Sequence, residues 1–363
     1  MTDIGSARTL RIAIVAASVA VLSVLPAFAV SGGEIVTYRG ADREQRLIEG
    51  ARREGQVVLY SGLIVNQMLR PLAAGFAKKY PFVKLTYWRA DSEELLPKLS
   101  AEARAGKPVA DLFEGSGGGE VAVEAGLTQP FYSPLLAEYP ESYRDPKGEL
   151  AATRLSYFGL AYNTKQVSAD KVPKTYLDLL DPRWKGRMAW PYATTGRYLF
   201  LINLRLAWGE ERAMAYFQKL AAQKIINFAS GSARTLVDRV IAGEYLLALN
   251  IYAHHPLISA AKGAPVNTQL MDPVASAAGT ISVVKDAPHP HAAMLLLDYI
   301  LSREGQKILA DAEYFPAHPD VPPLPQLAGI VPKTAGFAEN YIPPQQLKSY
   351  IDSTDRILQN LFR

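Results

Sequence analysis

Two short turns in this sequence place hydroxyl groups and a glycine directly before a helical pattern, each with an arginine close behind. One turn is Ser230–Ser232 with Arg234, and the other is Thr194–Gly196 with Arg197. The first backbone N–H groups of a helix have no partner within the helix, so they are free to bind an anion. Guanidinium groups add paired donors that suit a carboxylate, phosphate or phosphonate. The two turns therefore predict an anion-binding site, although ordinary helix capping uses the same residue types.

A tyrosine and two histidines follow the apolar run Tyr245–Ile251, which is predicted as a buried strand because it is short and strongly apolar. On a strand, Tyr252 and His254 would face one side and His255 the other. His254 and Tyr252 could then supply two ligands to a metal ion, with the remaining ligands not identifiable from the sequence. The chain has no cysteine, which excludes a thiolate metal site and a thiolate nucleophile.

Sequence patterns of enzymes are missing. G-x-S-x-G, H-E-x-x-H and the phosphate-binding P-loop do not occur, and Ser168–Lys171 fits S-x-x-K without the S-D-N and K-T-G partners of that chemistry. The net charge of +4 is small, and the basic residues are scattered among acidic ones, which argues against nucleic-acid binding. We therefore expect a binding protein with no catalytic residue and no cofactor.

The N-terminus has the form of a secretory signal peptide. Arg8 and Arg11 precede the charge-free run Ile12–Leu25, which is too short to span a bilayer, and Pro26–Ala29 provides an A-x-A cleavage site. We expect residues 1–29 to be removed by cleavage after Ala29 and the mature chain to reach the periplasm. The alternative is an uncleaved N-terminal anchor.

The remaining chain alternates strands and helices. Strands are predicted over residues 56–61, 82–88, 109–113, 156–162, 187–190 and 245–251, with two further extended stretches within 266–284. Helices are predicted over residues 41–54, 66–80, 121–125, 236–241, 292–301, 307–312 and 350–362, with others around Leu95 and after Gly196. Residues 315–325 are rich in proline and are predicted as a surface loop. The early order of strand, helix and strand favours a parallel α/β sheet.

Several short motifs together resemble one known family. They are V-V-L-Y-S-G, A-D-L-F-E-G-S, W-K-G-R, T-T-G, G-E-Y-L-L-A-L-N, A-P-H-P-H-A-A and L-S-R-E-G-Q, and the resemblance that they carry covers about residues 56–319. The chain resembles the periplasmic solute-binding proteins of bacterial ABC importers, and within them the branch of the ferric-iron-binding proteins. In A-P-H-P-H-A-A, His289 and His291 stand ahead of a helix, where we interpret them as packing or capping residues.

The resemblance implies an α/β fold with two lobes, each a mixed sheet flanked by helices, and a ligand cleft between them that closes by hinge bending. Lobe 1 would comprise residues 56–151 and 279–325, after an N-terminal leader and helix over 30–55. Lobe 2 would comprise residues 152–278 and 326–363, including the C-terminal helix. The connections between lobes would lie near residues 156–162 and 269–278.

The sequence departs from the iron-binding members at the expected metal ligands. Those members place a histidine after the first strand, an acidic residue after the third, and adjacent tyrosines at the end of the strand that corresponds to Leu246–Tyr252. Here Ser61 and Gly62, then Ser116 and Gly117, occupy the first two places, and Ala253 follows the single Tyr252. A ferric ion prefers several anionic oxygen ligands. We therefore expect a small anion or an anionic metal chelate, with a directly ligated ferric ion as the alternative.

The expected partners are a small-molecule solute and an ABC permease in the inner membrane, and the chain is expected to be a monomer. Arg89, Asp91 and Ser92 in the loop after the second strand could face the cleft or cap the next helix. The candidate ligand-binding residues are Ser61, Gly62, Arg89, Ser116, Gly117, Thr194, Thr195, Gly196, Arg197, Ser230, Ser232, Arg234 and Tyr252. The candidate metal ligand is His254.

Overall fold

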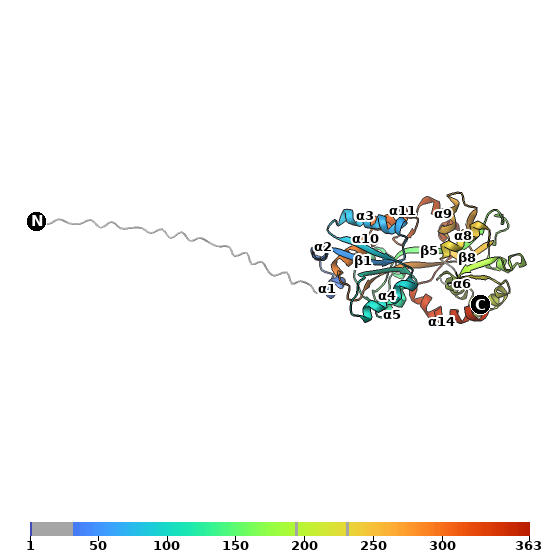
Figure 1. Cartoon of the computed structure of the whole chain (residues 1–363), viewed down its shortest axis with the longest axis horizontal. Coiled ribbons are helices and arrows are strands. Elements are labelled where there is room, and N and C mark those ends of the chain that lie inside the picture. The colour runs from blue at the N-terminus through green and yellow to red at the C-terminus, as the bar shows by residue number, and fades with distance from the viewer. Residues whose placement is uncertain (2–31, 193–194, 230–231) are drawn as a thin grey trace. The chain divides into compact units, whose positions relative to one another are not determined.

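Two groups of β-strands are joined by one long strand, β5 (Ala151–Asn163), which is buried along its whole length (Figure 1). The computed structural model describes Met1 and residues 32–192, 195–229 and 232–363, so the predicted signal peptide lies almost entirely outside the described residues. Residues 32–363 form one compact unit. Residues of β5 up to Tyr157 pair with the first group of strands, and residues from Phe158 onward pair with the second.

The first group is a mixed sheet with the strand order β2-β1-β3-β10-β5. Its strand β1 (Gln56–Ser61) pairs in parallel with β2 (Lys84–Arg89) and β3 (Leu112–Ser116). The predicted parallel arrangement of the early strands is confirmed. The long strand β10 (Val274–Val284) is antiparallel to both β3 and β5. This antiparallel insertion brings the carboxyl ends of β1 and β3 next to the middle of β5.

The second group contains the distal part of β5 together with strands from later in the chain. Strand β6 (Met188–Pro191) is parallel to β7 (Ile226–Phe228) and β8 (Leu247–Tyr252), whereas β5 is antiparallel to β8 and to β9 (Val266–Gln269). The chain returns to the first group between β9 and β10. The two passages between the groups therefore fall at the predicted connections, while the exact lobe boundaries stay a prediction.

Helices cover the sheets on both sides, so the predicted α/β fold class is confirmed. In the first group, α3 and α10 lie on one face of the sheet and α4 and α5 on the other (Figure 1). The helices are α1 (Gly32–Thr37), α2 (Arg43–Glu54), the π-helical turn η1 (Val65–Leu69), α3 (Arg70–Lys79), α4 (Ser92–Arg104), α5 (Gly119–Glu124), α6 (Thr195–Trp208), α7 (Glu210–Ala221), α8 (Ala233–Ala242), α9 (His254–Ala260), α10 (Pro290–Leu301), α11 (Arg303–Asp311), α12 (Pro325–Ala328), α13 (Pro332–Ala335) and α14 (Pro344–Leu361). The remaining short strands are β4 (Thr128–Gln129), β11 (Phe315–Pro316) and β12 (Glu339–Tyr341). Among the described residues, no helix is both long and apolar enough to cross a membrane.

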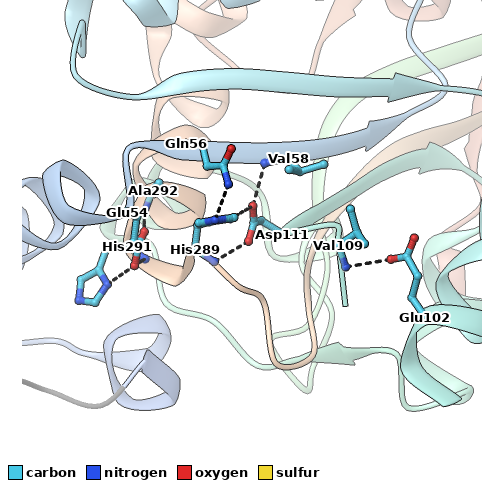
Figure 2. A network of polar contacts seen from close by, with 9 residues as sticks. All are labelled: Glu54, Gln56, Val58, Glu102, Val109, Asp111, His289, His291 and Ala292. Atoms are coloured by element: carbon cyan, nitrogen blue, oxygen red, sulfur yellow. Dashed lines mark hydrogen bonds and ion pairs between the residues drawn. The ribbon is translucent and has the colours of Figure 1, made fainter. Parts of the chain in front are cut away.

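A buried polar network ties the start of α10 to the first sheet (Figure 2). The carboxylate of Asp111 accepts hydrogen bonds from the backbone N–H of Val58 at 2.7 Å and from the backbone N–H and Nδ1 of His289 at 2.7 and 2.9 Å. The carboxylate of Glu54 accepts a hydrogen bond from Nδ1 of His291 at 2.6 Å and from the backbone N–H groups of His291 and Ala292 at 3.2 and 2.8 Å. The two histidines were interpreted as packing or capping residues; their side chains pack in this network, whereas Asp111 and Glu54 accept the N–H groups at the start of α10.

Three local predictions were wrong. The C-terminal helix α14 begins at Pro344 instead of Tyr350. Residues 315–325 are not simply a surface loop, because Phe315 and the following residue form β11 on β5, and Phe315 packs against Tyr157 with ring centroids 4.8 Å apart. Strand β8 ends at Tyr252, and His254 begins a helix. The last difference changes the directions of both histidine side chains at the site described next.

Candidate anion-binding cavity

A cavity of about 170 Å³ lies where the carboxyl ends of several strands meet the first residues of helices. Its walls come from the loop between β1 and η1, from the end of β2, from the starts of α4 and α8, from β3 and β5, from the junction of β8 with α9, and from the residue before β11. It is lined by Gly62, Ile64, Arg89, Asp91, Ser92, Ser116, Arg154, Ser156, Ser232, Ala233, Arg234, Tyr252, His254, His255 and Tyr314. The structure thus brings together six of the predicted ligand-binding residues and the predicted metal ligand.

Arg154 of β5 places a guanidinium group at the cavity. Its side chain is only 7% exposed, and Nη1 forms an ion pair with the carboxylate of Glu114 on β3. Its Nη2 donates a hydrogen bond to Oγ of Ser116 at 3.1 Å. Burial lowers the pKa of Arg154, but a guanidinium paired with a carboxylate remains charged at neutral pH. Glu114 is in turn held by Oγ of Ser61, which donates to it at 2.6 Å.

The start of α4 forms a second wall. Arg89 donates from Nη2 to Oδ1 of Asp91 at 2.9 Å, and Ser92 donates from Oγ to the backbone oxygen of Ser116 at 3.3 Å. Glycines at the end of β3 and just after it allow this contact, because a β-carbon at Gly115 would lie 2.5 Å from Oγ of Ser92 and one at Gly118 would lie 2.7 Å from Cβ of Ser92. The end of β3 therefore packs closely against the first turn of α4. The N-terminal end of the α4 dipole lies at the cavity wall.

The start of α8 forms the opposite wall. Oγ of Ser232 accepts a hydrogen bond from the backbone N–H of Thr235 at 3.3 Å, so the predicted turn does cap a helix. Arg234 donates from Nη1 to the backbone oxygen of His255 at 3.1 Å and from Nη2 to Asp238 at 3.1 Å. These contacts fix the guanidinium beside the cavity, and its side chain remains 40% exposed.

Aromatic and imidazole rings complete the lining. The His254 ring lies 4.6 Å from that of His255 and 6.0 Å from that of Tyr314, and the Tyr252 ring lies 5.1 Å from that of His255, measured between centroids. Because α9 begins at His254, both histidines line the cavity, and the prediction that they face opposite sides was wrong. Nδ1 of each histidine is buried without a hydrogen-bond partner in the protein.

Both imidazoles are neutral at physiological pH. Burial, with the nearby cations Arg154 and Arg234, lowers the pKa of His254 to about 3. Burial, with neighbouring His254 and Arg234, lowers the pKa of His255 well below its usual value. A neutral imidazole offers one donor and one acceptor nitrogen. Across the described ranges, no three His, Asp or Glu side chains come together to hold a metal ion.

The other predicted residues lie elsewhere. Ser61 is behind Glu114, and Gly117 lines a smaller neighbouring cavity of about 10 Å³. The backbone oxygen of Gly196 accepts from Nδ2 of Asn250 at 2.6 Å, and the buried Arg197 lies over the Tyr192 ring, so neither lines the 170 Å³ cavity. Thr195 is the first residue of α6. The predictions for Thr194 and Ser230 fall outside the described residues.

Sequence reasoning missed Arg154, Ser156, His255 and Tyr314 as lining residues. Arg154 left a signal, because it is a lone charge within the buried run of β5, and charged residues are rarely buried without a specific partner. Tyr314 left none, because it follows α11 in a segment that has no pattern of its own. It joins the cavity only because β11 carries it onto β5.

Comparisons with known proteins are consistent with this geometry. A family profile described as "Bacterial extracellular solute-binding protein" matches residues 107–330. The iron uptake protein A1 of Synechocystis sp. is 28% identical over 334 residues, which is 85% of this chain and 86% of that protein.

Solved structures share the fold. The periplasmic binding protein AfuA of Actinobacillus pleuropneumoniae, solved with fructose-6-phosphate, has a TM-score of 0.71 and 23% identity, covering 85% of this chain and 99% of that one. A Trichodesmium protein in complex with iron and citrate has a TM-score of 0.69 and 21% identity, again covering 85% and 99%.

Proposed function

This chain belongs to the bacterial extracellular solute-binding proteins, and from that premise we propose that its cavity captures a small anion, or a metal carried as an anionic chelate. The family profile covers more than half of the chain, and it confirms the prediction of a solute-binding protein. Delivery of the solute to a bacterial ABC importer is part of the proposal. The chemical class of the solute follows from the residues around the cavity.

The observation that carries the proposal is the convergence of cationic and N–H donors on one cavity. Arg154, Arg89 and Arg234 line it from three directions, and the first turns of α4 and α8 meet there. Each helix start contributes about half of a positive charge, and hydrogen bonds to a charged partner are stronger than those between neutral groups. The hydroxyl groups of Ser92, Ser116, Ser156 and Ser232 and the neutral imidazoles add further polar contacts.

Each arginine already has a carboxylate nearby: Glu114 for Arg154, Asp91 for Arg89 and Asp238 for Arg234. The site is thus a set of fixed dipoles and partly neutralised cations, which binds an anion through oriented donors. The fructose-6-phosphate and citrate in the two solved relatives are anions of the expected size class, and they guide the choice of probes.

Capture would follow from closure around the solute. Arg89 and Ser116 belong to the proposed lobe 1, whereas Arg234, Tyr252 and His254 belong to the proposed lobe 2. A solute that contacts both sets stabilises the closed state, and the passages through β5 and between β9 and β10 provide the hinge. The permease would then recognise the closed form.

Direct ligation of a ferric ion is the second candidate, because Tyr252 and Tyr314 both line the cavity and one relative is named as an iron uptake protein. Two phenol groups are more than the sequence alone suggested. Against this, Glu114, the acidic residue of the third strand, is already paired with Arg154 and Ser61. Burial also raises the pKa of Tyr314, which disfavours its phenolate form.

The family is extracellular, and we propose that export proceeds by cleavage after Ala29, so that the mature chain starts at Val30. N-terminal sequencing of protein recovered from a bacterial periplasm tests this, and an intact Met1 would refute it. The mature chain would act as a monomer that delivers its solute to an inner-membrane permease and performs no catalysis.

The decisive experiment is native mass spectrometry of the exported protein purified without chelators, compared with its denatured mass. An added mass of an organic or phosphorus anion supports the proposal, and iron alone supports direct ligation. Calorimetric titration of the solute-free protein with citrate, iron(III) citrate and fructose 6-phosphate follows. The proposal is wrong if no anionic mass is added and none of the three probes binds.

A further inference from the structure

Three residues stand in one row across the middle of the first sheet. Gly279 of β10 is opposite Ser116 of β3 on one side and opposite Arg154 of β5 on the other. Directly opposite residues of antiparallel strands direct their side chains to the same face. Arg154 and Ser116 therefore share a face with an empty position between them. Across this position the guanidinium of Arg154 donates to Oγ of Ser116 at 3.1 Å.

The space above Gly279 is filled by the arginine itself. A β-carbon at Gly279 would lie 2.5 Å from Cζ of Arg154 and 2.9 Å from Nε, which is closer than real carbon contacts allow. Any side chain at this position would have to push the guanidinium away. The backbone of Gly279 is not in the left-handed region, so it does not require glycine for conformational reasons. The register of β10 against β5 shifts directly after this residue, between Gly279 and Thr280, and the space above Gly279 is limited by the Arg154 side chain.

The same guanidinium is fixed at a second point. Its Nη1 pairs with Glu114, and Ser61, which stands opposite Glu114 on β1, donates to that carboxylate at 2.6 Å. A polar chain of Ser61, Glu114, Arg154 and Ser116 thus crosses β1, β3, β10 and β5 on one face. With both anchors in place, little freedom is left to the side chain of Arg154, and donors that are ordered in advance bind more tightly.

We propose that Gly279 is a positioning residue for solute binding: by leaving its place in the row empty, it lets Arg154 reach across β10 and present a fixed guanidinium to the anion. This inference rests on the proposed function, since it assigns to Arg154 the main charged contact. It also explains why a glycine occupies the centre of a buried strand, where an alanine would otherwise be favoured.

The test is Gly279→Ala, with Gly329→Ala as the matched control. Gly329 follows α12 with φ −67°, and a β-carbon there would have no atom within 4 Å. Calorimetric titration with citrate, iron(III) citrate and fructose 6-phosphate should show about tenfold to 100-fold weaker binding for Gly279→Ala, as expected for loss of a charged hydrogen bond. Gly329→Ala should bind as the wild type does.

A double-mutant cycle separates positioning from general damage. The second background carries Arg154→Ala together with Glu114→Gln, so that no charge is left buried alone. In this background, Gly279→Ala meets no guanidinium that it could displace. Gly279→Ala should then leave the already weakened Kd unchanged, because the effects of two residues that act through one contact are not additive. An equal loss in both backgrounds would overturn the inference.

The remaining outcomes are distinct. If the wild type binds none of the three probes and carries no anion after export, the proposed function fails and this inference fails with it. If the wild type binds a probe and Gly279→Ala binds it as tightly, only the inference fails. If Gly279→Ala prevents folding in the wild-type background but not in the Arg154→Ala, Glu114→Gln background, the steric clash between a side chain at position 279 and Arg154 is confirmed. If Gly279→Ala prevents folding in both backgrounds, this clash is contradicted.

Discussion

The buried carboxyl group of Glu120 gives the most quantitative test of the structure. Glu120 lies on α5, is only 7% exposed, and faces a small cavity beside Tyr252 and Leu347. Burial, with a smaller contribution from the negative charge of Asp145, raises the pKa of Glu120 from 4.5 to about 7. The perturbation is Glu120→Gln, which keeps the size of the side chain and removes the titration.

The magnitude follows from linkage between protonation and folding. Between pH 4.5 and about 7, the folded protein keeps a proton that the unfolded chain has lost, so the free energy of unfolding decreases as the pH rises through this window. The rise in pKa corresponds to about 3 kcal/mol of unfolding free energy, which is present at pH values below 4.5 and is fully lost above about pH 7. When the pH is raised from acidic to alkaline conditions, the free energy of unfolding of Glu120→Gln should therefore increase by about 3 kcal/mol relative to that of the wild type.

Urea unfolding of both proteins at about pH 4.5 and about pH 8 measures this difference, and any constant effect of the amide cancels between the two conditions. Glu211→Gln, at an exposed position of α7, is the control and should show less than about 0.5 kcal/mol of change. If the difference between Glu120→Gln and the wild type is the same at both pH values, the carboxyl group is hydrated in solution and the reasoning is refuted.

Two further predictions concern buried groups outside α5. Asp111→Ala should lower the free energy of unfolding by about 2 to 4 kcal/mol, because the buried N–H groups of Val58 and His289 lose their acceptor. The Kd for citrate should stay unchanged. Weaker citrate binding would contradict the separation of this network from the cavity. In the wild type, the His254 imidazole has a pKa of about 3 and stays unprotonated in the folded state, whereas the unfolded chain takes up a proton below about pH 6.5. The free energy of unfolding therefore falls as the pH is lowered from about 6.5 to about 5. His254→Asn should make this fall smaller by about 2 kcal/mol. Urea unfolding across this range checks it, and an unchanged slope would show that His254 is accessible to water.

Local features of the fold were predictable because they depend on neighbours within a few residues. The strand over 56–61 matches β1, and the helix over 41–54 matches α2 to within two residues at its start. Ser232 was predicted from its residue type as the start of a helix, and it does cap α8. Of the residues predicted at the ends of β1 and β3, Gly62 and Ser116 line the cavity, because strand ends in α/β sheets lie next to helix starts, and their contact with a ligand stays a prediction.

Errors arose where a long-range contact overrides a local pattern. Residues 315–325 contain several prolines, but Phe315 is buried against Tyr157 because β5 has an unpaired edge there. The run Tyr245–Ile251 looks like a strand that continues to the histidines, but α9 begins at His254 and turns both rings into the cavity. Neither partner is visible in the sequence around the residue concerned.

The sequence by itself carried the motifs, spread over several segments, by which the chain resembles its family. It also determined the alternation of strands and helices and the presence of hydroxyl groups and arginines at helix starts, because composition and spacing within one segment are enough for these two features. Only the tertiary structure decided that Arg154, and not Arg197, reaches the cavity. That outcome depends on the register of four strands, which sets Ser61 opposite Glu114 and leaves Gly279 empty between Ser116 and Arg154. Register is fixed by the packing of the whole sheet, so no single stretch of sequence contains it.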